Sequence, residues 1–212
     1  MVNHANLVQG RLPFWMATLV FLGGWQVMLW AMMVPASVDA IRWRRGLRDQ
    51  AVFTSGYLGI WTGFGLLLLV FDVVVHGIVN HSPWLSLHPW LIAGGVLVFT
   101  GAFQLSHLKV RSLAACRVWE TGPPSRATSL PASLAAGFGY GVKCVGSSGA
   151  LMFLAFALGM GSIPFIAGFT ALMVWETTPW GAKTVPLVGY TLIGVGVVIL
   201  AGPFQGLPLW AG

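Results

Sequence analysis

Charged residues are scarce in this chain. Asp, Glu, Lys and Arg make up 8% of the 212 residues, whereas soluble domains carry about a quarter. Hydrophobic residues make up 57%, so we expect lipid to surround most of the chain. The net charge of +6 does not indicate nucleic-acid binding, because basic residues of membrane proteins gather in cytoplasmic loops. The composition argues against a soluble domain and predicts the lipid bilayer, not nucleic acid, as a partner.

Cysteine and the common catalytic motifs are also sparse. Two cysteines, Cys116 and Cys144, provide no disulfide framework. The sequence has no phosphate-binding GxxxxGK, no GxGxxG and no HExxH. The Gly-Ser-Ser-Gly run at 146–149 lacks the strand that precedes the nucleophile of a serine hydrolase. The sequence therefore favours a protein without enzymatic activity.

Long apolar runs fill most of the chain. They predict an all-α fold, a polytopic transmembrane helical bundle in one integral membrane domain over residues 1–212. About 20 apolar residues cross the hydrocarbon core, which gives about six spans. These are expected at 12–35, 55–79, 89–108, 133–158, 163–177 and 185–201. The separator at 159–162 is weak, so five spans with a kink or a re-entrant segment are the alternative.

Basic residues alternate between the connections. They follow the first, third and fifth spans, at Arg42, Arg44, Arg45, Arg48, Lys109, Arg111, Arg117, Arg126 and Lys183. Cytoplasmic loops carry the excess of Lys and Arg, so both termini are predicted outside the cytoplasm. Arg11 is the exception. The third connection, 110–132, contains Gly122-Pro123-Pro124 and is expected to be irregular.

Several polar side chains fall inside the predicted spans. A charge near the bilayer centre costs about 2.5–3.5 kcal/mol on insertion scales, so Lys143 requires a partner or a wet cavity. Gln104, Lys143 and Glu176 all lie in the half of the bundle near the cytoplasm once the orientation is assigned. Two interpretations remain: a structural ion pair between Lys143 and Glu176, or an intramembrane functional site.

Soft sulfur ligands occur in the same half. Met28 and Met32 are four residues apart and share a helix face, Met33 lies near its edge, and Cys144 lies in the fourth span. Thioethers and thiolates suit Cu(I), so we predict a metal site formed by these four residues. The alternative is that the methionines simply fill gaps in apolar packing.

A second candidate metal site lies on the opposite side. Asp72 and His76 form an i, i+4 pair at the end of the second span, and His81 and His88 follow in the short connection. Imidazole and carboxylate at this spacing can bind a divalent metal or relay a proton. The alternative is a hydrated pair at the membrane surface, because closed metal sites need about four ligands.

The ordered motifs of the chain resemble the DUF2182 family of predicted metal-binding integral membrane proteins of bacteria. The motifs are Trp25-xx-Met28-xx-Ala31-Met32-Met33-x-Pro35, Gly56-Tyr57-xxx-Trp61, Gln104-xxxx-Lys109-xxxxxx-Cys116-Arg117, and Gly141-xx-Cys144-x-Gly146 followed by Leu151-Met152 and Glu176. The resemblance implies a multi-pass protein of the bacterial inner (cytoplasmic) membrane that binds or handles a metal. In that membrane, the orientation predicted from the basic residues places both termini in the periplasm. Copper is the metal that the sulfur ligands favour.

The chain departs from the family pattern at several cysteines. Ser112 stands where relatives have a cysteine four residues before the one matching Cys116. Ser147 and Ser148 stand in the segment that reads Cys-x-x-Cys-Cys-Trp in relatives. A hydroxyl does not replace a thiolate for a soft metal at comparable affinity.

Three functions fit these observations. The first is copper handling in the membrane. The second is a non-catalytic membrane subunit that scaffolds or anchors a larger complex, with Lys143 and Glu176 holding the bundle together. The third is a proton-coupled carrier that uses Asp72, His76, Lys143 and Glu176.

Overall fold

The protein is described by a computed structural model over residues 13–44, 46–121, 129–158, 163–178 and 180–202. Helices and short connections make up these residues, and no strand occurs among them, which confirms the all-α class. The helices are α2 (Phe14–Ala36), α3 (Val38–Arg42), α4 (Gly46–His81), α5 (Pro83–Ser86), α6 (Pro89–Gln104), α7 (His107–Thr121), α8 (Leu130–Ala157), α9 (Ile163–Thr177) and α10 (Gly181–Leu200).

Length and apolarity show which helices are suited to cross a membrane. Within the described part of the chain, α2, α4, α8 and α10 meet both requirements, and α6 with α7 would make a fifth span if the bent pair is taken together. The 15 residues of α9 extend about 22 Å, which is less than the hydrocarbon thickness of about 30 Å. Each predicted span therefore has a helix, but the number of spans stays a prediction.

A bend between α6 and α7 is the main departure from the predicted spans. The third span was expected to continue to residue 108, but α6 ends at Gln104 and α7 leaves at an angle of 60°. The hydroxyl of Ser106 accepts a hydrogen bond from the backbone N–H of Lys109 at 3.2 Å, as a helix N-cap does. The connection predicted to be irregular is thus helical through Thr121, while Gly122-Pro123-Pro124 lies outside the described residues.

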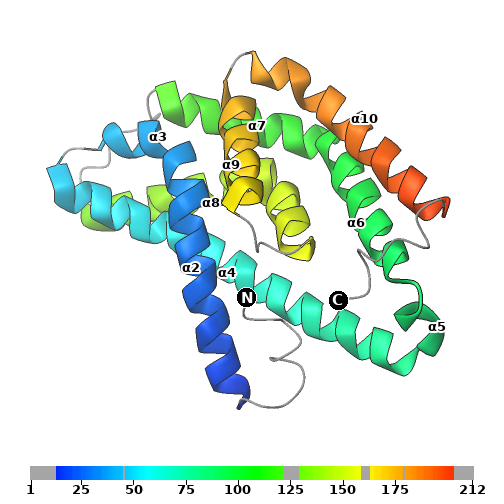
Figure 1. Cartoon of the computed structure of the whole chain (residues 1–212). Helices are drawn as coiled ribbons and strands as arrows, with labels where there is room; N and C mark the ends of the chain where they lie inside the picture. The colour runs from blue at the N-terminus through cyan, green and yellow to red at the C-terminus, as the bar shows by residue number, and fades with distance from the viewer. Residues whose placement is uncertain (1–12, 45, 122–128, 159–162, 179, 203–212) are drawn as a thin grey trace.

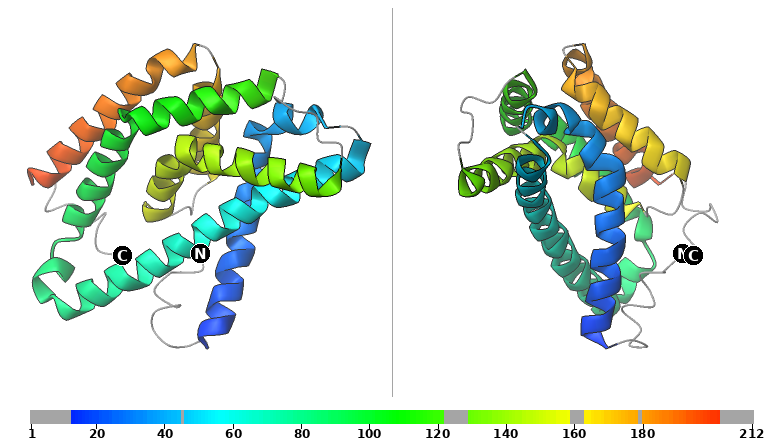
Figure 2. Two further views of the ribbon diagram at one scale, coloured as in Figure 1. Left: turned by 180° about the vertical axis from the view of Figure 1, so that it is seen from behind. Right: turned by 90° about the vertical axis from the view of Figure 1, so that its left-hand side faces the viewer.

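The helices form two close pairs. α4 packs along α8, and α6 packs along α10 (Figure 1). α2 crosses α4, and α9 lies beside α2, as the two turned views also show (Figure 2). α5 turns the chain from the end of α4 into α6. The buried core lies where α2, α4, α7, α8 and α9 meet.

Glycines allow both pairs to pack with their backbones in contact. A Cβ atom on Gly137 of α8 would collide with the carbonyl oxygen of Phe53 in α4. A Cβ atom on Gly101 of α6 would lie 2.6 Å from the carbonyl oxygen of Gly189 in α10. Small residues at helix contacts permit this approach in membrane proteins, where dispersion forces replace the hydrophobic effect between helices.

Gly137→Ala should lower the free energy of unfolding by about 1–3 kcal/mol, because the added methyl group forces α4 and α8 apart. Gly139→Ala is the matched control, since nothing lies within 4 Å of a Cβ atom at that position of the same helix. The control should be neutral or stabilising by up to about 1 kcal/mol. Denaturant titration in detergent micelles measures both, and equal effects would contradict a tight contact at Gly137.

Candidate functional site

A buried ion pair lies inside the bundle. Lys109 Nζ is 2.6 Å from Glu176 Oε2, and neither side chain is more than 2% exposed. Gln104 Nε2 donates to Glu176 Oε1 at 2.8 Å, and Lys109 Nζ also donates to the carbonyl oxygen of Ser147. These contacts connect α6, α7, α8 and α9. The two charges can stay in an apolar core because they are paired and hydrogen-bonded.

Lys109 occupies the position that was predicted for Lys143. Gln104 and Glu176 do converge, as expected, but the cation that contacts Glu176 comes from α7. Lys143 lies half-buried on α8. The bend after α6 explains the difference, because it returns α7 across α8 and places Lys109 in the core. The Gln104-xxxx-Lys109 spacing of the family motif was the sequence signal for this contact.

Arg117 holds the end of α9, the helix that supplies Glu176. Its Nε donates to the carbonyl oxygen of Thr177 at 2.8 Å, and its Nη2 donates to the carbonyl oxygens of Glu176 at 3.2 Å and Thr178 at 2.6 Å. The last carbonyl groups of a helix have no partners within the helix, and a cation complements their partial negative charge. Arg117 therefore positions the backbone that carries the Glu176 carboxylate.

The predicted sulfur ligands lie in one buried cluster. Met28, Met32, Met33 and Cys144 are each 6% exposed or less and belong to the same core. The spacing on α2 accounts for Met28 and Met32, because residues four apart share a helix face, and Met33 lies at the edge of that face. Sulfur-bearing residues that were not among the predicted ligands join them: Cys116, Met152 and Met173. Seven sulfur-bearing residues from α2, α7, α8 and α9 thus belong to one buried core, and these seven are called the sulfur core below.

Tyr57 connects the methionine helix to Cys144. Its hydroxyl donates to the backbone carbonyl oxygen of Met33 at 3.4 Å and lies 3.3 Å from Cys144 Sγ. The whole Tyr57 side chain is buried. One hydroxyl of α4 therefore contacts both α2 and α8, and it brings the backbone of Met33 close to the Cys144 thiol. Its place in the Gly56-Tyr57 motif was the only sequence signal for this role.

Ser147 connects the sulfur core to the ion pair. Its hydroxyl lies 3.7 Å from Cys116 Sγ and donates to the carbonyl oxygen of Cys144 at 2.9 Å. Its own carbonyl oxygen accepts from Lys109. Neither Cys116 nor Cys144 forms a disulfide. At the interface between α7 and α8, Ser147 thus connects two free cysteines to a buried ammonium group.

The four residues of the alternative outer site do not assemble into a metal site. Asp72 and His76 make the expected i, i+4 pair, with 3.3 Å between Oδ1 and Nδ1. His81 and His88 instead direct Nδ1 to backbone carbonyl oxygens four residues earlier. In the described ranges, no group of three or more His, Cys, Asp or Glu side chains is arranged to hold a metal ion. Nδ1 of each of the three histidines lies within hydrogen-bond distance of the carbonyl oxygen four residues earlier.

Arg44, between α3 and α4, is a further buried cation. Its guanidinium lies 4.4 Å from the centre of the Phe53 ring and 5.7 Å from that of Trp119. Nε and Nη2 have no hydrogen-bond partner among the described residues. Burial lowers the pKa of Arg44, and the nearby Asp49 carboxylate opposes that shift. The aromatic faces stabilise the charge by cation–π contact, which gives Arg44 a packing role at this end of the bundle.

The donor set of the core determines what it can bind. Thiols and thioethers are soft ligands that select Cu(I), whereas carboxylate and water ligands suit Mg²⁺ and Ca²⁺. Two thiols and the methionine thioethers belong to one buried core, and the carboxylate of Glu176 is already paired with Lys109. The side chains gathered here are thus of the soft donor type and not the oxygen donors that hard divalent metals prefer.

Comparison with known proteins gives one match. The model of the family PpoB2, described as a copper chaperone, matches residues 22–199. No curated protein and no solved structure matches the chain. The matched region contains α4 to α9 in full, together with all the sulfur ligands and the ion pair. The chain therefore belongs to the PpoB2 copper chaperone family, the family also called DUF2182.

Proposed function

We propose that this chain is a multi-pass protein of the bacterial inner membrane that binds Cu(I) as cargo and passes it on. One observation carries the proposal. In a member of a copper chaperone family, three methionines of α2 and both cysteines share a single buried core. Four long apolar helices support the membrane location, because an α-helix satisfies its backbone hydrogen bonds internally and can therefore cross lipid.

The thiols of Cys116 and Cys144 are the central ligands in this proposal. The ammonium of Lys109 donates to the carbonyl oxygen of Ser147, whose hydroxyl lies 3.7 Å from Cys116 Sγ, and a neighbouring cation favours the thiolate that binds metal. Glu176 compensates the lysine, so the pair adds no net charge to the core. Met28, Met32 and Met33 would supply neutral thioethers from α2, which the Tyr57 hydroxyl connects to Cys144. This arrangement can hold a soft cation without water in its coordination shell.

Met32→Leu should lower Cu(I) affinity by about 10–100-fold. Loss of a group that only supports a metal ligand already has an effect of this size. Leucine keeps the volume and apolar character of the fully buried Met32 but removes its sulfur. Met16→Leu is the control, because Met16 lies on the same helix and is 38% exposed. Competition titration with a Cu(I) chelator under reducing conditions measures both variants in detergent.

Two results would contradict the proposal. Absence of stoichiometric copper from wild-type protein, purified under reducing and copper-replete conditions, would reject Cu(I) as the cargo. Equal affinity of wild-type protein and Met32→Leu would exclude the methionine face of α2 from the site.

A further inference from the structure

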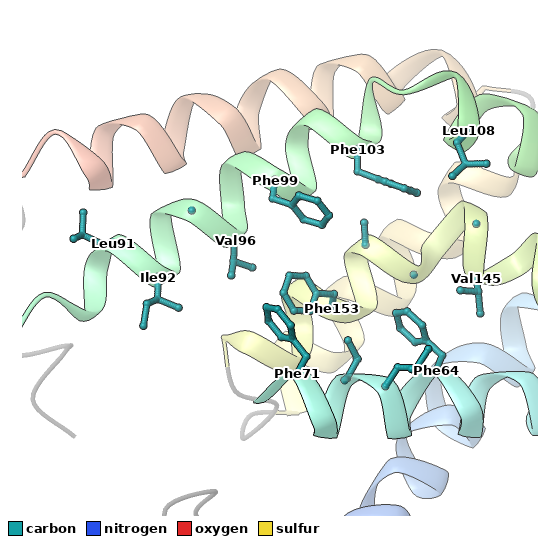
Figure 3. Close-up of a pocket in the computed structure, with 16 residues that line it drawn as sticks. Phe64, Phe71, Leu91, Ile92, Val96, Phe99, Phe103, Leu108, Val145 and Phe153 are labelled. Atoms are coloured by element: carbon teal, nitrogen blue, oxygen red, sulfur yellow. The ribbon is translucent and has the colours of Figure 1, made fainter. Parts of the chain in front are cut away.

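The helices also enclose an apolar cavity of about 830 Å³, and none of the residues of the sulfur core lines it. α4 and α6 form its walls and α8 forms its floor, with side chains from both walls converging on Phe153 (Figure 3). All sixteen lining residues are Phe, Leu, Ile, Val, Ala or Gly, so no side chain in the lining can donate or accept a hydrogen bond. The volume is within the range of ligand-binding pockets, about 300–1,000 Å³.

The cavity opens sideways onto the apolar surface of the helices. Leu67 and Phe71 on α4, and Phe99 on α6, line it and are at least half exposed. Val70 and Val74, which continue the outer surface of α4 beyond the mouth, are also more than half exposed. A ligand would therefore enter from the surroundings of these apolar side chains. In a membrane protein those surroundings are lipid chains.

The lining also determines the chemistry of the occupant. A polar or charged ligand would lose its hydrogen bonds to water and gain none from the side chains here, which is unfavourable. A hydrocarbon chain loses nothing, and it fills a space that would otherwise forfeit van der Waals contacts. The apolar lining and the exposed opening both suit the acyl chain of a lipid, because the headgroup of that lipid can stay outside the cavity.

We propose that this cavity binds an acyl chain of a membrane phospholipid between α4 and α6. The inference rests on the membrane location proposed above but not on copper binding. The bound chain would fill the space between two helices that both pack on α8, the helix that carries Cys144. Gly149 and Ala150 of α8 line the cavity. Cys144 of the same helix belongs to the sulfur core, and the Ser147 hydroxyl lies beside Cys116 Sγ.

Gly95→Trp tests the site directly. Gly95 lines the cavity between Leu91 and Phe99 at four-residue spacing, and nothing lies within 4 Å of a Cβ atom there. An indole at this position would fill the cavity without a clash at its attachment point. Gly194→Trp is the matched control, because Gly194 is an exposed glycine of α10 with equally open space and does not line the cavity.

Native mass spectrometry of the full chain, extracted from membranes and washed in detergent, counts the bound lipid. Wild-type protein and Gly194→Trp should retain a phospholipid, and Gly95→Trp should lose it. Retention by all three, loss by all three, or a bound molecule other than a phospholipid would overturn the proposal. Copper occupancy of Gly95→Trp should equal that of wild type, so failure here is distinguishable from failure of the copper proposal.

A second measurement does not depend on how the variant folds. Wild-type protein is incubated with a phospholipid that carries a diazirine near the end of one acyl chain, and the photocrosslinks are mapped by peptide sequencing. They should concentrate in residues 64–71 of α4 and 91–103 of α6, which line the cavity. Crosslinks spread evenly over the exposed faces of α2 and α10 would overturn the proposal.

Discussion

Glu176→Gln is expected to lower the free energy of unfolding by about 3–5 kcal/mol, which is the cost of leaving a buried charge without its partner. Lys109 is completely buried, and its ammonium group would keep only the Ser147 carbonyl oxygen and the neutral amide as partners. Glutamine preserves the shape of the side chain and a carbonyl oxygen for Gln104. The loss therefore reports the removed charge and not a cavity. Denaturant titration in mixed micelles measures it.

Two companion variants identify the source of the loss. Adding Lys109→Met to Glu176→Gln removes the unpaired cation and should recover most of the lost stability, because an apolar replacement of a buried pair is often neutral. Lys143→Met should change stability little, since Lys143 is half-buried and is not the partner of Glu176. A loss for Lys143→Met as large as that for Glu176→Gln would contradict the assignment of Lys109 as the partner of Glu176.

Replacing both Cys116 and Cys144 by serine should lower Cu(I) affinity by more than about 100-fold, the upper size of effects from groups that only support metal ligands. Both thiols are buried in the sulfur core, and serine offers a similar shape with a hard oxygen donor. Competition with a Cu(I) chelator measures the affinity. Thermal unfolding of the same samples shows whether the core is intact.

Ser147→Cys gives the opposite test of the same site. Its hydroxyl oxygen lies 3.7 Å from Cys116 Sγ, so a cysteine would place a third thiol beside the first. We expect tighter Cu(I) binding than in wild-type protein. Wild-type affinity in the double serine variant, together with no gain in Ser147→Cys, would place the copper site away from the α7–α8 interface.

Two serines, Ser112 and Ser147, also lie at that same interface. Ser112 of α7 packs directly against Gly146 of α8, and Ser147 contacts Cys116. Segments of α7 and α8 that are distant in sequence are therefore neighbours in space. In the proposed copper site, the methionines of α2 would supply soft donors that these serine hydroxyls do not.

Much of the fold could be predicted from composition and hydropathy. A chain with 57% hydrophobic residues must satisfy its backbone internally wherever it lies in lipid, and helices achieve this with local hydrogen bonds alone. The helices at each predicted span and the shared face of Met28 and Met32 follow from local rules of this kind. The family membership followed from the order and spacing of short motifs.

The tertiary structure alone decided which side chains meet. Lys109 rather than Lys143 pairs with Glu176, Cys116 joins Cys144, and the outer histidines stay apart, because helix packing and the α6–α7 bend set these contacts. Hydropathy specifies that a helix forms but not which of its faces meets which neighbour. The physical reason is that helix formation depends on residues within about one turn. The partners of buried side chains lie much further along the chain: Lys109 and Glu176 are 67 residues apart, and Cys116 and Ser147 are 31 residues apart.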